Sequence, residues 1–297
     1  AYKHRSDQLR SIRRGGNTVT TSRTRETVDH LAKLIGSCAI VDLTLTLDER
    51  KPVSWPNATP FQLHATNSYD DDGRVPIRGG PYKTHTLLLD EHTGTHFDAP
   101  SHFIPAPDSG LPHAGPAGLI TGDKADLRTM MGPAAVIDCR HLVGKEPGIS
   151  PIITPDVIKQ DEERNGELRE GDVVLFWTAW DEQHFVDRHV SDSYVEEPFR
   201  LGTKPGWPAP DVDAAQYLHS KGVRFLATDG TSMGPVHDGA PVHWWALAND
   251  MLFLEAGTNF GALPPRGAWF QFLPIKVAGS TGGAGRAMAF VPNEGDA

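Results

Sequence analysis

The stretch 91–103, which reads EHTGTHFDAPSHF, constrains this chain more than any other part of it. Four side chains that can bind a metal or a proton stand there at positions of one parity: His92, His96, Asp98 and His102. On an extended backbone even spacings place side chains on one face, whereas on a helix Asp98 would be turned away from the first two histidines. Gly94 and Pro100 also disfavour a helix. We therefore predict an extended segment with one polar face.

Such a segment is too long for all four groups to reach one atom, because an extended chain advances by about 3.3 Å per residue. Gly94 and Pro100 lie between the polar side chains and allow the chain to bend. The bend would draw His92, His96 and Asp98 together, with the fourth group slightly apart. Two imidazoles and one carboxylate, with positions left open for water and substrate, suit a divalent zinc or manganese ion.

A second pair of candidate ligands stands downstream. Glu255 ends the apolar run 251–254, and His243 precedes it by twelve residues. A carboxylate at the end of a buried strand needs a cation, because burying it unpaired would cost several kcal/mol. A metal is one partner for both side chains. A plain hydrogen bond to His243 and an arginine beside Glu255 are the alternatives.

These two segments carry a resemblance to a known family. HTGTHFDAPSHF resembles the His-x-Gly-Thr-His-x-Asp-x-Pro-x-His signature of the metal-dependent hydrolases called the cyclase family, which includes bacterial kynurenine formamidase and isatin hydrolase. The later string PVHWWALANDMLFLEAG is similar to the family's second metal-binding segment, and the string VSWP at 53–56 is similar to its substrate-side tryptophan loop. The similarity extends from about residue 40 to about residue 291.

The resemblance implies a metal site made of two groups that share one carboxylate: His92, His96 and Asp98 for a first ion, and Asp98, His243 and Glu255 for a second where two are present. It also implies that His102 is the general base and acid. The implied fold is an α/β, swivelling β/β/α-type, sheet-rich domain that assembles as a homodimer or homotetramer. This chain is longer than the kynurenine formamidases, in a basic N-terminal arm and around 179–210, which leaves the substrate open.

Hydrophobic periodicity independently predicts a sheet-rich α/β fold. Strands are expected where apolar residues alternate or run together: 40–47, 85–90, 134–138, 173–177, 223–227, 251–255, 269–275 and 287–291. Helices are expected at 155–165, with Thr154 as N-cap and Pro155 as first residue, and at 211–220. The glycine-rich stretch 279–285 is predicted to be a turn, because it lacks the frame and the Lys-Ser/Thr ending of a phosphate-binding loop.

Charge divides the chain into a basic N-terminal arm, 1–37, and a markedly acidic body, 38–297. The net charge of −10 disfavours polyanions, so we predict no nucleic-acid partner. We expect the arm to be a solvated extension that docks on its own domain or on a neighbouring subunit; a nucleic-acid arm and an organellar presequence are the alternatives. Within the body, 179–210 lacks periodicity and is expected to be a lid insertion or a surface decoration.

Cysteine usage and hydropathy bear on the compartment. Cys38 and Cys139 are the two cysteines of the chain, and their separation fits neither a zinc site nor a disulfide framework. We expect free thiols and a cytoplasmic protein. No apolar run approaches the roughly 18 residues that a membrane helix needs. We therefore expect no membrane partner, and the basic start lacks the apolar stretch of a secretory signal.

Aromatic residues shape the prediction of the substrate. Trp55 lies in a proline-rigid loop, where a large ring is not needed for a strand interior, so we expect a small, flat, ring-bearing molecule as substrate. Phe97 and Phe103 have the parity opposite to the polar face and should anchor the metal segment to the core. The expected substrate-binding residues are Trp55, Phe61, Phe103 and Ser232.

A serine nucleophile is not expected, although GTSMG at 230–234 has the Gly-x-Ser-x-Gly spacing. We predict a hydrolase that cleaves an amide, lactam or lactone bond with a metal-activated water and with His102 as general base and acid. The alternative is a metal-stabilised, non-catalytic binding or scaffold protein whose ions are structural.

Overall fold

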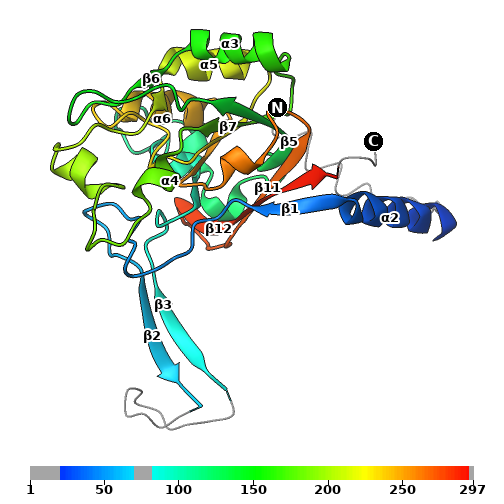
Figure 1. The fold of residues 1–297 in the computed structure, drawn as a ribbon, viewed down its shortest axis with the longest axis horizontal. Helices are drawn as coiled ribbons and strands as arrows, with labels where there is room; N and C mark the ends of the chain where they lie inside the picture. The colour runs from blue at the N-terminus through cyan, green and yellow to red at the C-terminus, as the bar shows by residue number, and fades with distance from the viewer. Residues whose placement is uncertain (1–20, 70–81, 294–297) are drawn as a thin grey trace. The chain divides into compact units, whose positions relative to one another are not determined.

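The computed structural model describes residues 21–69 and 82–293 of the chain. Contacts divide the chain into a body, Ile40–Val291, and a smaller unit made of residues 1–39 and 292–297. In the described part of the smaller unit, Thr21–Gly36 form the helix α2 (Figure 1), which the sequence did not predict. Residues 1–20, which hold much of the predicted basic arm, lie outside the described residues.

The body is built on one eight-stranded sheet (Figure 1). Its strands in chain order are β1 (Cys38–Asp42), β4 (His96–Asp98), β5 (Met131–Asp138), β7 (Val173–Trp177), β9 (Phe225–Thr228), β10 (Leu252–Glu255), β11 (Ala268–Pro274) and β12 (Gly282–Pro292). Their order in the sheet is β1-β12-β11-β5-β7-β9-β10-β4, and β12 pairs with β4 as well. That additional pairing closes the strands from β12 to β4 into a barrel-like ring. β5, β7, β9 and β10 run parallel, while β4, β11 and β12 pair antiparallel to their neighbours.

Alternate residues of the parallel strands bury two hydrophobic cores. In β7, Val173 and Leu175 pack with Phe97 in a cluster to which strands all around the ring contribute. Val174 and Phe176 point the other way and pack against the helices. Both faces of the strand are therefore buried, which explains why its sequence, VVLFW, is apolar throughout rather than alternating.

The helices that cover the sheet are α3 (Pro155–Asn165), α5 (Val212–Ser220) and α6 (Ala240–Ala248). The first two confirm the predicted helices, and the Asp211 carboxylate caps α5 by accepting a hydrogen bond from the Ala214 amide at 2.7 Å. The sequence did not predict α6. Its sequence, APVHWWALA, is apolar almost all round and so lacks the amphipathic period that marks a surface helix.

Two short sheets complete the body. β2 (Gln62–Asn67) and β3 (Thr84–Leu88) form a two-stranded antiparallel sheet, and β3 ends earlier than the predicted strand at 85–90. β6 (Ile152–Ile153) and β8 (Ala209–Pro210) form a parallel pair.

The predicted strand at 40–47 is wrong in its second half, because β1 ends at Asp42. The alternation of burial continues beyond it, with Leu43 at 0% and Leu45 at 4% exposure. The backbone there is held differently: the Leu45 amide donates to the Thr95 hydroxyl at 2.8 Å instead of to a strand. The alternating hydrophobic pattern of 40–47 therefore predicted its buried side chains correctly and its strand pairing incorrectly.

The predicted turn at 279–285 is also wrong in its second half, because β12 begins at Gly282. Gly282 is opposite Asp98 in the antiparallel pairing of β12 with β4. A Cβ atom at Gly282 would lie 2.5 Å from the carbonyl oxygen of Phe97, so only glycine allows this approach of the two strands.

The segment 179–210 packs into the body. It contains α4 (Trp180–His184) and a π-helical turn, Glu196–Arg200. Trp180, Tyr194 and Trp207 are buried in a third hydrophobic cluster. No helix in the part of the chain that the structure describes is long and apolar enough to cross a bilayer.

Candidate metal centre and active-site cavity

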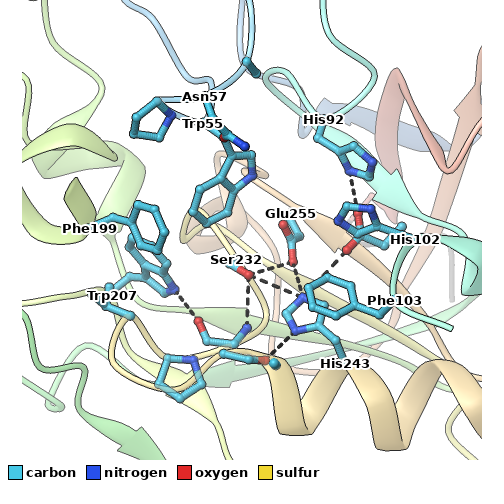
Figure 2. Close-up of a pocket in the computed structure, with 18 of the residues that line it drawn as sticks. Trp55, Asn57, His92, His102, Phe103, Phe199, Trp207, Ser232, His243 and Glu255 are labelled. Carbon is cyan, nitrogen blue, oxygen red and sulfur yellow. Dashed lines mark hydrogen bonds and ion pairs between the residues drawn. The ribbon is translucent and has the colours of Figure 1, made fainter. Parts of the chain in front are cut away.

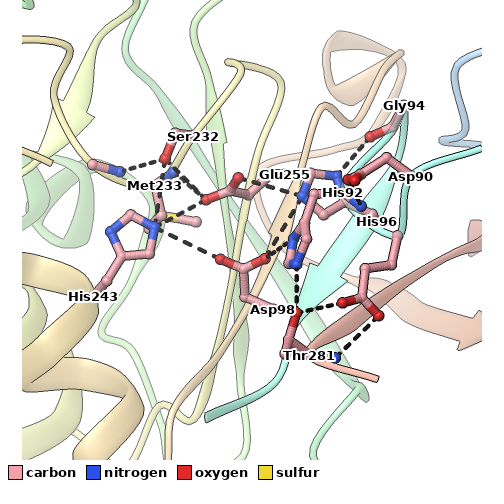
Figure 3. Close-up of polar contacts among 12 residues, drawn as sticks. Asp90, His92, Gly94, His96, Asp98, Ser232, Met233, His243, Glu255 and Thr281 are labelled. Atoms are coloured by element: carbon pink, nitrogen blue, oxygen red, sulfur yellow. Dashed lines mark hydrogen bonds and ion pairs between the residues drawn. The ribbon is translucent and has the colours of Figure 1, made fainter. Parts of the chain in front are cut away.

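The candidate metal ligands come from four neighbouring places in the fold (Figure 3). His92 lies in the turn before β4, and His96 and Asp98 are the ends of that strand. Glu255 ends β10 and is opposite His96 in the antiparallel pairing of the two strands. His243 projects from α6. The pairing of β4 with β10 thus joins the two segments that lie far apart in the sequence.

The metal segment is extended only over His96–Asp98, and it bends on both sides of that strand. Gly94 has a φ of +63°, in the left-handed region that favours glycine. Its amide donates to the carbonyl of Val53 at 2.8 Å, which fixes the bend. Beyond the strand, Pro100–His102 form a 3-10 turn. The predicted bends are confirmed, while a continuous extended segment is wrong.

The ligand atoms of the first predicted group lie close together. His92 Nδ1 is 2.9 Å from Asp98 Oδ1, and His96 Nε2 is 3.6 Å from the same oxygen. The second group meets the other side of the carboxylate: His243 Nε2 lies 3.7 Å from Asp98 Oδ2 and 3.3 Å from Glu255 Oε1. Within each group the ligand atoms lie within 4.8 Å of one another, and Asp98 belongs to both groups.

Two backbone carbonyls orient the imidazoles. His96 Nδ1 donates to the Gly94 carbonyl at 2.8 Å, and His243 Nδ1 donates to the Gly239 carbonyl at 2.7 Å. Each ring therefore carries its proton on Nδ1 and presents the lone pair of Nε2 to the cluster. Such hydrogen bonds to the outer nitrogen are typical of metal-ligating histidines.

The donor set fits a divalent cation. His96 Nε2 is buried and has no hydrogen-bond partner in the part of the chain that the structure describes. A buried lone pair without a donor is costly, and here it faces two carboxylates, Asp98 and Glu255, at 3.6 and 3.5 Å. A cation among these atoms would satisfy all three groups at once, and histidine with carboxylate ligands suits zinc or manganese.

The pKa values of the cluster reflect its two carboxylates and its imidazoles acting on one another: the pKa of Asp98 is lowered, and those of His92 and His243 are raised. Burial alone would raise the pKa of Asp98, but the imidazoles of His102 and His92 hold it well below its usual range. Burial opposes protonation of His92, yet the Asp98 carboxylate raises the pKa of that imidazole to about 8. For His243 too, burial is outweighed, and the hydrogen bond and charge of Glu255 raise its pKa.

A cavity of about 770 Å³ opens beside the cluster (Figure 2). Asp98, His243 and Glu255 line one side of it. On the other side stands a wall of three aromatic rings: Trp55, Phe199 and Trp207. Trp55 meets the edge of Phe199 at a centroid distance of 4.9 Å and that of Trp207 at 6.3 Å. The cavity therefore joins a polar floor to an apolar wall.

His102 also lines the cavity. Its ring stacks on His92 and meets Phe103 edge-on at 4.7 Å. His102 remains solvent-exposed at the cavity, but desolvation by the protein atoms around it lowers its pKa, although the Asp98 carboxylate acts against this. His102 is thus neutral at neutral pH and faces the space that a substrate would fill.

The comparisons with known proteins agree with this geometry. Residues 41–235 match the family described as "Putative cyclase". The chain belongs to this cyclase family. An isatin hydrolase from Roseibium aggregatum is 30% identical over 273 residues, which cover 88% of this chain and 95% of that protein. A kynurenine formamidase from Erythrobacter litoralis is 25% identical over 250 residues, which cover 84% of this chain and 92% of that protein.

A solved structure shares the fold of this cyclase-family chain. Isatin hydrolase A from Labrenzia aggregata, bound to benzyl benzoate, superposes with a TM-score of 0.71 at 26% identity. The match covers 91% of this chain and 100% of that one. In line with these relatives, the chain is a hydrolase, and its two groups of His, Asp and Glu side chains could hold a divalent metal. The resemblance drawn from the two metal segments is confirmed.

The cyclase-family cavity contains most of the residues expected to bind substrate. Trp55, Phe103 and Ser232 line it. Phe103 does so by stacking on His243 at a centroid distance of 4.2 Å, so it faces the cavity as well as the core. Phe61 is not among the described residues that line the cavity: it directly precedes β2, and its side chain is buried in protein at 9% exposure.

Glu255 has no arginine partner among the described residues. Its carboxylate accepts hydrogen bonds from the Ser232 hydroxyl at 3.1 Å and from the Met233 amide at 2.7 Å. These donors hold the side chain in place without neutralising its charge. The alternative prediction that an arginine pairs with Glu255 is therefore wrong for the described part of the chain.

Sequence reasoning missed several residues of the cavity. Phe199 and Arg200 belong to the segment without periodicity, and Asp90 and Asn57 lie in loops. No spacing rule marked these positions, because they reach the cavity through tertiary packing. The aromatic and charged content of 179–210 was the one available signal in the sequence.

Proposed function

We propose that this cyclase-family protein hydrolyses an amide, lactam or lactone bond of a small, ring-bearing substrate. The observation that carries the proposal is the buried convergence of three histidines and two carboxylates, with an unpartnered His96 Nε2 among them, on one side of an aromatic-walled cavity. The relatives named isatin hydrolase and kynurenine formamidase support the class of bond.

We assign the metal ligands in two groups. His92, His96 and Asp98 would hold a first zinc or manganese ion, and Asp98, His243 and Glu255 would hold a second where two are present. The bound ion would supply Lewis-acid polarisation of the scissile carbonyl and would make water more acidic. The shared carboxylate explains why both groups lie so close together.

His102 is the proposed general base and acid. Its lowered pKa keeps the imidazole unprotonated at neutral pH, so it accepts a proton from the attacking water. The imidazolium then returns this proton to the nitrogen or oxygen that leaves as the bond breaks. Asp98, which is buried and ionised, stabilises the transient positive charge on the ring.

The aromatic wall supports a flat substrate. Trp55 and Phe199 present ring surfaces across the cavity from the polar cluster, and Trp207, which is 1% exposed, packs against Trp55 and supports it. A planar ring packed between them would bury apolar area while its carbonyl reaches the cluster, and aromatic pairs of this kind contribute about 0.5–1.5 kcal/mol beyond area burial. Ser232, which donates to Glu255, is the proposed polar contact near the reacting group.

The experiment is an assay of the purified protein on formylated anilines, isatin and unsaturated lactones, before and after treatment with a chelator. We expect turnover on at least one class, loss of it with the chelator, and recovery with zinc or manganese. The His102→Ala variant should bind metal and lack turnover. No chelator-sensitive turnover on any of these carbonyl compounds, or full activity in His102→Ala, would contradict the proposal and favour a binding protein with structural ions.

A further inference from the structure

Behind His92 lies a chain of hydrogen bonds that the proposed mechanism does not use (Figure 3). His92 Nε2 lies 3.0 Å from the Thr281 hydroxyl oxygen. That hydroxyl lies 2.6 Å from Glu91 Oε1, and the Thr281 amide donates to Glu91 Oε2 at 3.1 Å. Glu91 thus holds Thr281 with both of its carboxylate oxygens.

The direction of the protons follows from the chemistry of the three groups. A carboxylate only accepts hydrogen bonds, so the single hydroxyl proton of Thr281 goes to Glu91. The hydroxyl oxygen is then left with lone pairs toward His92. It accepts a hydrogen bond from the ring only if the proton is on Nε2, which leaves Nδ1 free to coordinate a cation beside Asp98.

The backbone around Thr281 keeps this acceptor in place. The Thr281 carbonyl accepts a hydrogen bond from the Ala99 amide at 2.9 Å, and the next residue, Gly282, pairs with Asp98. A Cβ atom at Gly282 would lie 2.7 Å from Cε1 of the His92 ring, so the glycine leaves the space that the ring occupies. The glycine-rich stretch predicted as a turn therefore forms the wall behind a metal ligand.

We propose that Thr281, held by Glu91, is a positioning residue that keeps the His92 proton on Nε2 and so directs Nδ1 at the metal. Backbone carbonyls orient His96 and His243 in the same way, but in those two rings the protonated nitrogen is Nδ1 rather than Nε2. The inference rests on the proposed function, because it requires a metal at the cluster. It adds a side-chain relay, which a substitution can remove, to a site whose other histidines are oriented by the backbone.

The test compares zinc binding by the full chain and four variants, by competition with a chromogenic chelator. Thr281→Val keeps the shape of the side chain and removes the acceptor, and we expect zinc affinity to fall about 10- to 100-fold. Thr281→Ser restores the hydroxyl and should bind within about threefold of the parent. Glu91→Ala frees the hydroxyl proton to face His92 and should weaken binding by about tenfold. Ser280→Ala removes a neighbouring hydroxyl that has no hydrogen-bond partner among the described residues, and it should change nothing.

A second measurement reads the proton itself. In nitrogen-15 spectra of the zinc-loaded protein, the Nε2 proton of His92 should exchange slowly with water, and in Thr281→Val it should exchange fast. The Nδ1 protons of His96 and His243 serve as internal references, because their carbonyl acceptors are untouched, and they also show that the variant is folded. Parent-like zinc affinity together with a retained Nε2 signal in Thr281→Val would overturn the inference. Failure of the parent protein to bind zinc or manganese would instead overturn the proposed function.

Discussion

The imidazole rings of His92 and His102 stack with their centroids 3.8 Å apart and their planes at 24°. One ring is a proposed metal ligand and the other the proposed general base. Because both are cationic when protonated, each disfavours protonation of the other, and His92 is one of the groups that lower the pKa of His102. The protonation state of His92 at the metal site therefore affects the pKa of His102, the proposed base.

His102→Asn should lower kcat by about 10²- to 10⁴-fold, the usual contribution of a positioned acid or base. Metal content should not change, because the residue is not in either ligand group. The pH dependence of kcat/KM tests the same role. Desolvation lowers the pKa of His102 from 6.5, so kcat/KM of the parent should fall as the pH drops through a value below 6.5. This fall in kcat/KM at acidic pH should be absent in His102→Asn. His64→Asn, on the exposed hairpin, is the matched control, and a variant with parental kcat would remove His102 from the mechanism.

Metal affinity should rise with pH. In the absence of metal the Asp98 carboxylate, acting against burial, raises the pKa of His92 to about 8, so below that pH a proton must leave the ring before a cation binds. We expect the apparent zinc affinity to fall by about tenfold per pH unit below this value and to level off above it. Chelator competition across a pH series measures the effect. An affinity independent of pH between 6.5 and 8 would show that His92 is not a ligand.

Asp98→Asn should weaken metal binding more than Glu255→Gln does. Only Asp98 belongs to both ligand groups, with Oδ1 near His92 and His96 and Oδ2 near His243. We expect a loss beyond the about 100-fold that marks an outer partner of a ligand. Elemental analysis of both variants, together with chelator competition, provides the measurement. Equal losses in the two variants would argue against a carboxylate shared between the groups.

Trp55→Ala should raise KM for a ring-bearing substrate by about tenfold and leave kcat nearly unchanged, because the ring contributes packing on the cavity wall rather than proton transfer. Trp55→Phe should recover most of the loss. Trp269 is 44% exposed and does not line the cavity, so Trp269→Ala serves as the control. If kcat fell in place of a rise in KM, Trp55 would act at the reacting bond.

Gly94→Ala should both destabilise the fold and weaken metal binding. A left-handed backbone costs a non-glycine residue about 1–2 kcal/mol, and the new Cβ would also lie 2.6 Å from Leu47 Cδ2. Gly110 has a φ of +70° with nothing within 4 Å of a Cβ, so Gly110→Ala shares only the backbone strain. Urea unfolding should show a loss in both variants, and zinc affinity should fall in Gly94→Ala alone. Unchanged affinity there would mean that the bend does not set the ligand geometry.

Much of the site was predictable because its residues are close in sequence or follow a known spacing. The parity of the segment 91–103 indicated a metal site, and the bends at Gly94 and beside Pro100 were predicted from their backbone preferences. Helix α3 was predicted from its proline start and α5 from the apolar face of 211–220, whereas the capping role of Asp211 came only from the structure. Helix α6 was missed, because a helix buried on nearly every side has no polar face to give it a period.

The sequence by itself determined the chemistry of this protein: which side chains can bind a divalent ion, where the chain bends to bring three of them together, and which strands are buried on both faces. Only the tertiary structure decided that β10 pairs with β4 and so brings Glu255 to His96, that Phe199 and Trp207 complete the wall beside Trp55, and that Thr281 stands behind His92. The physical reason is that local preferences act over a few residues, whereas these contacts join residues up to 189 positions apart. They arise from strand pairing and burial over the whole ring of the sheet.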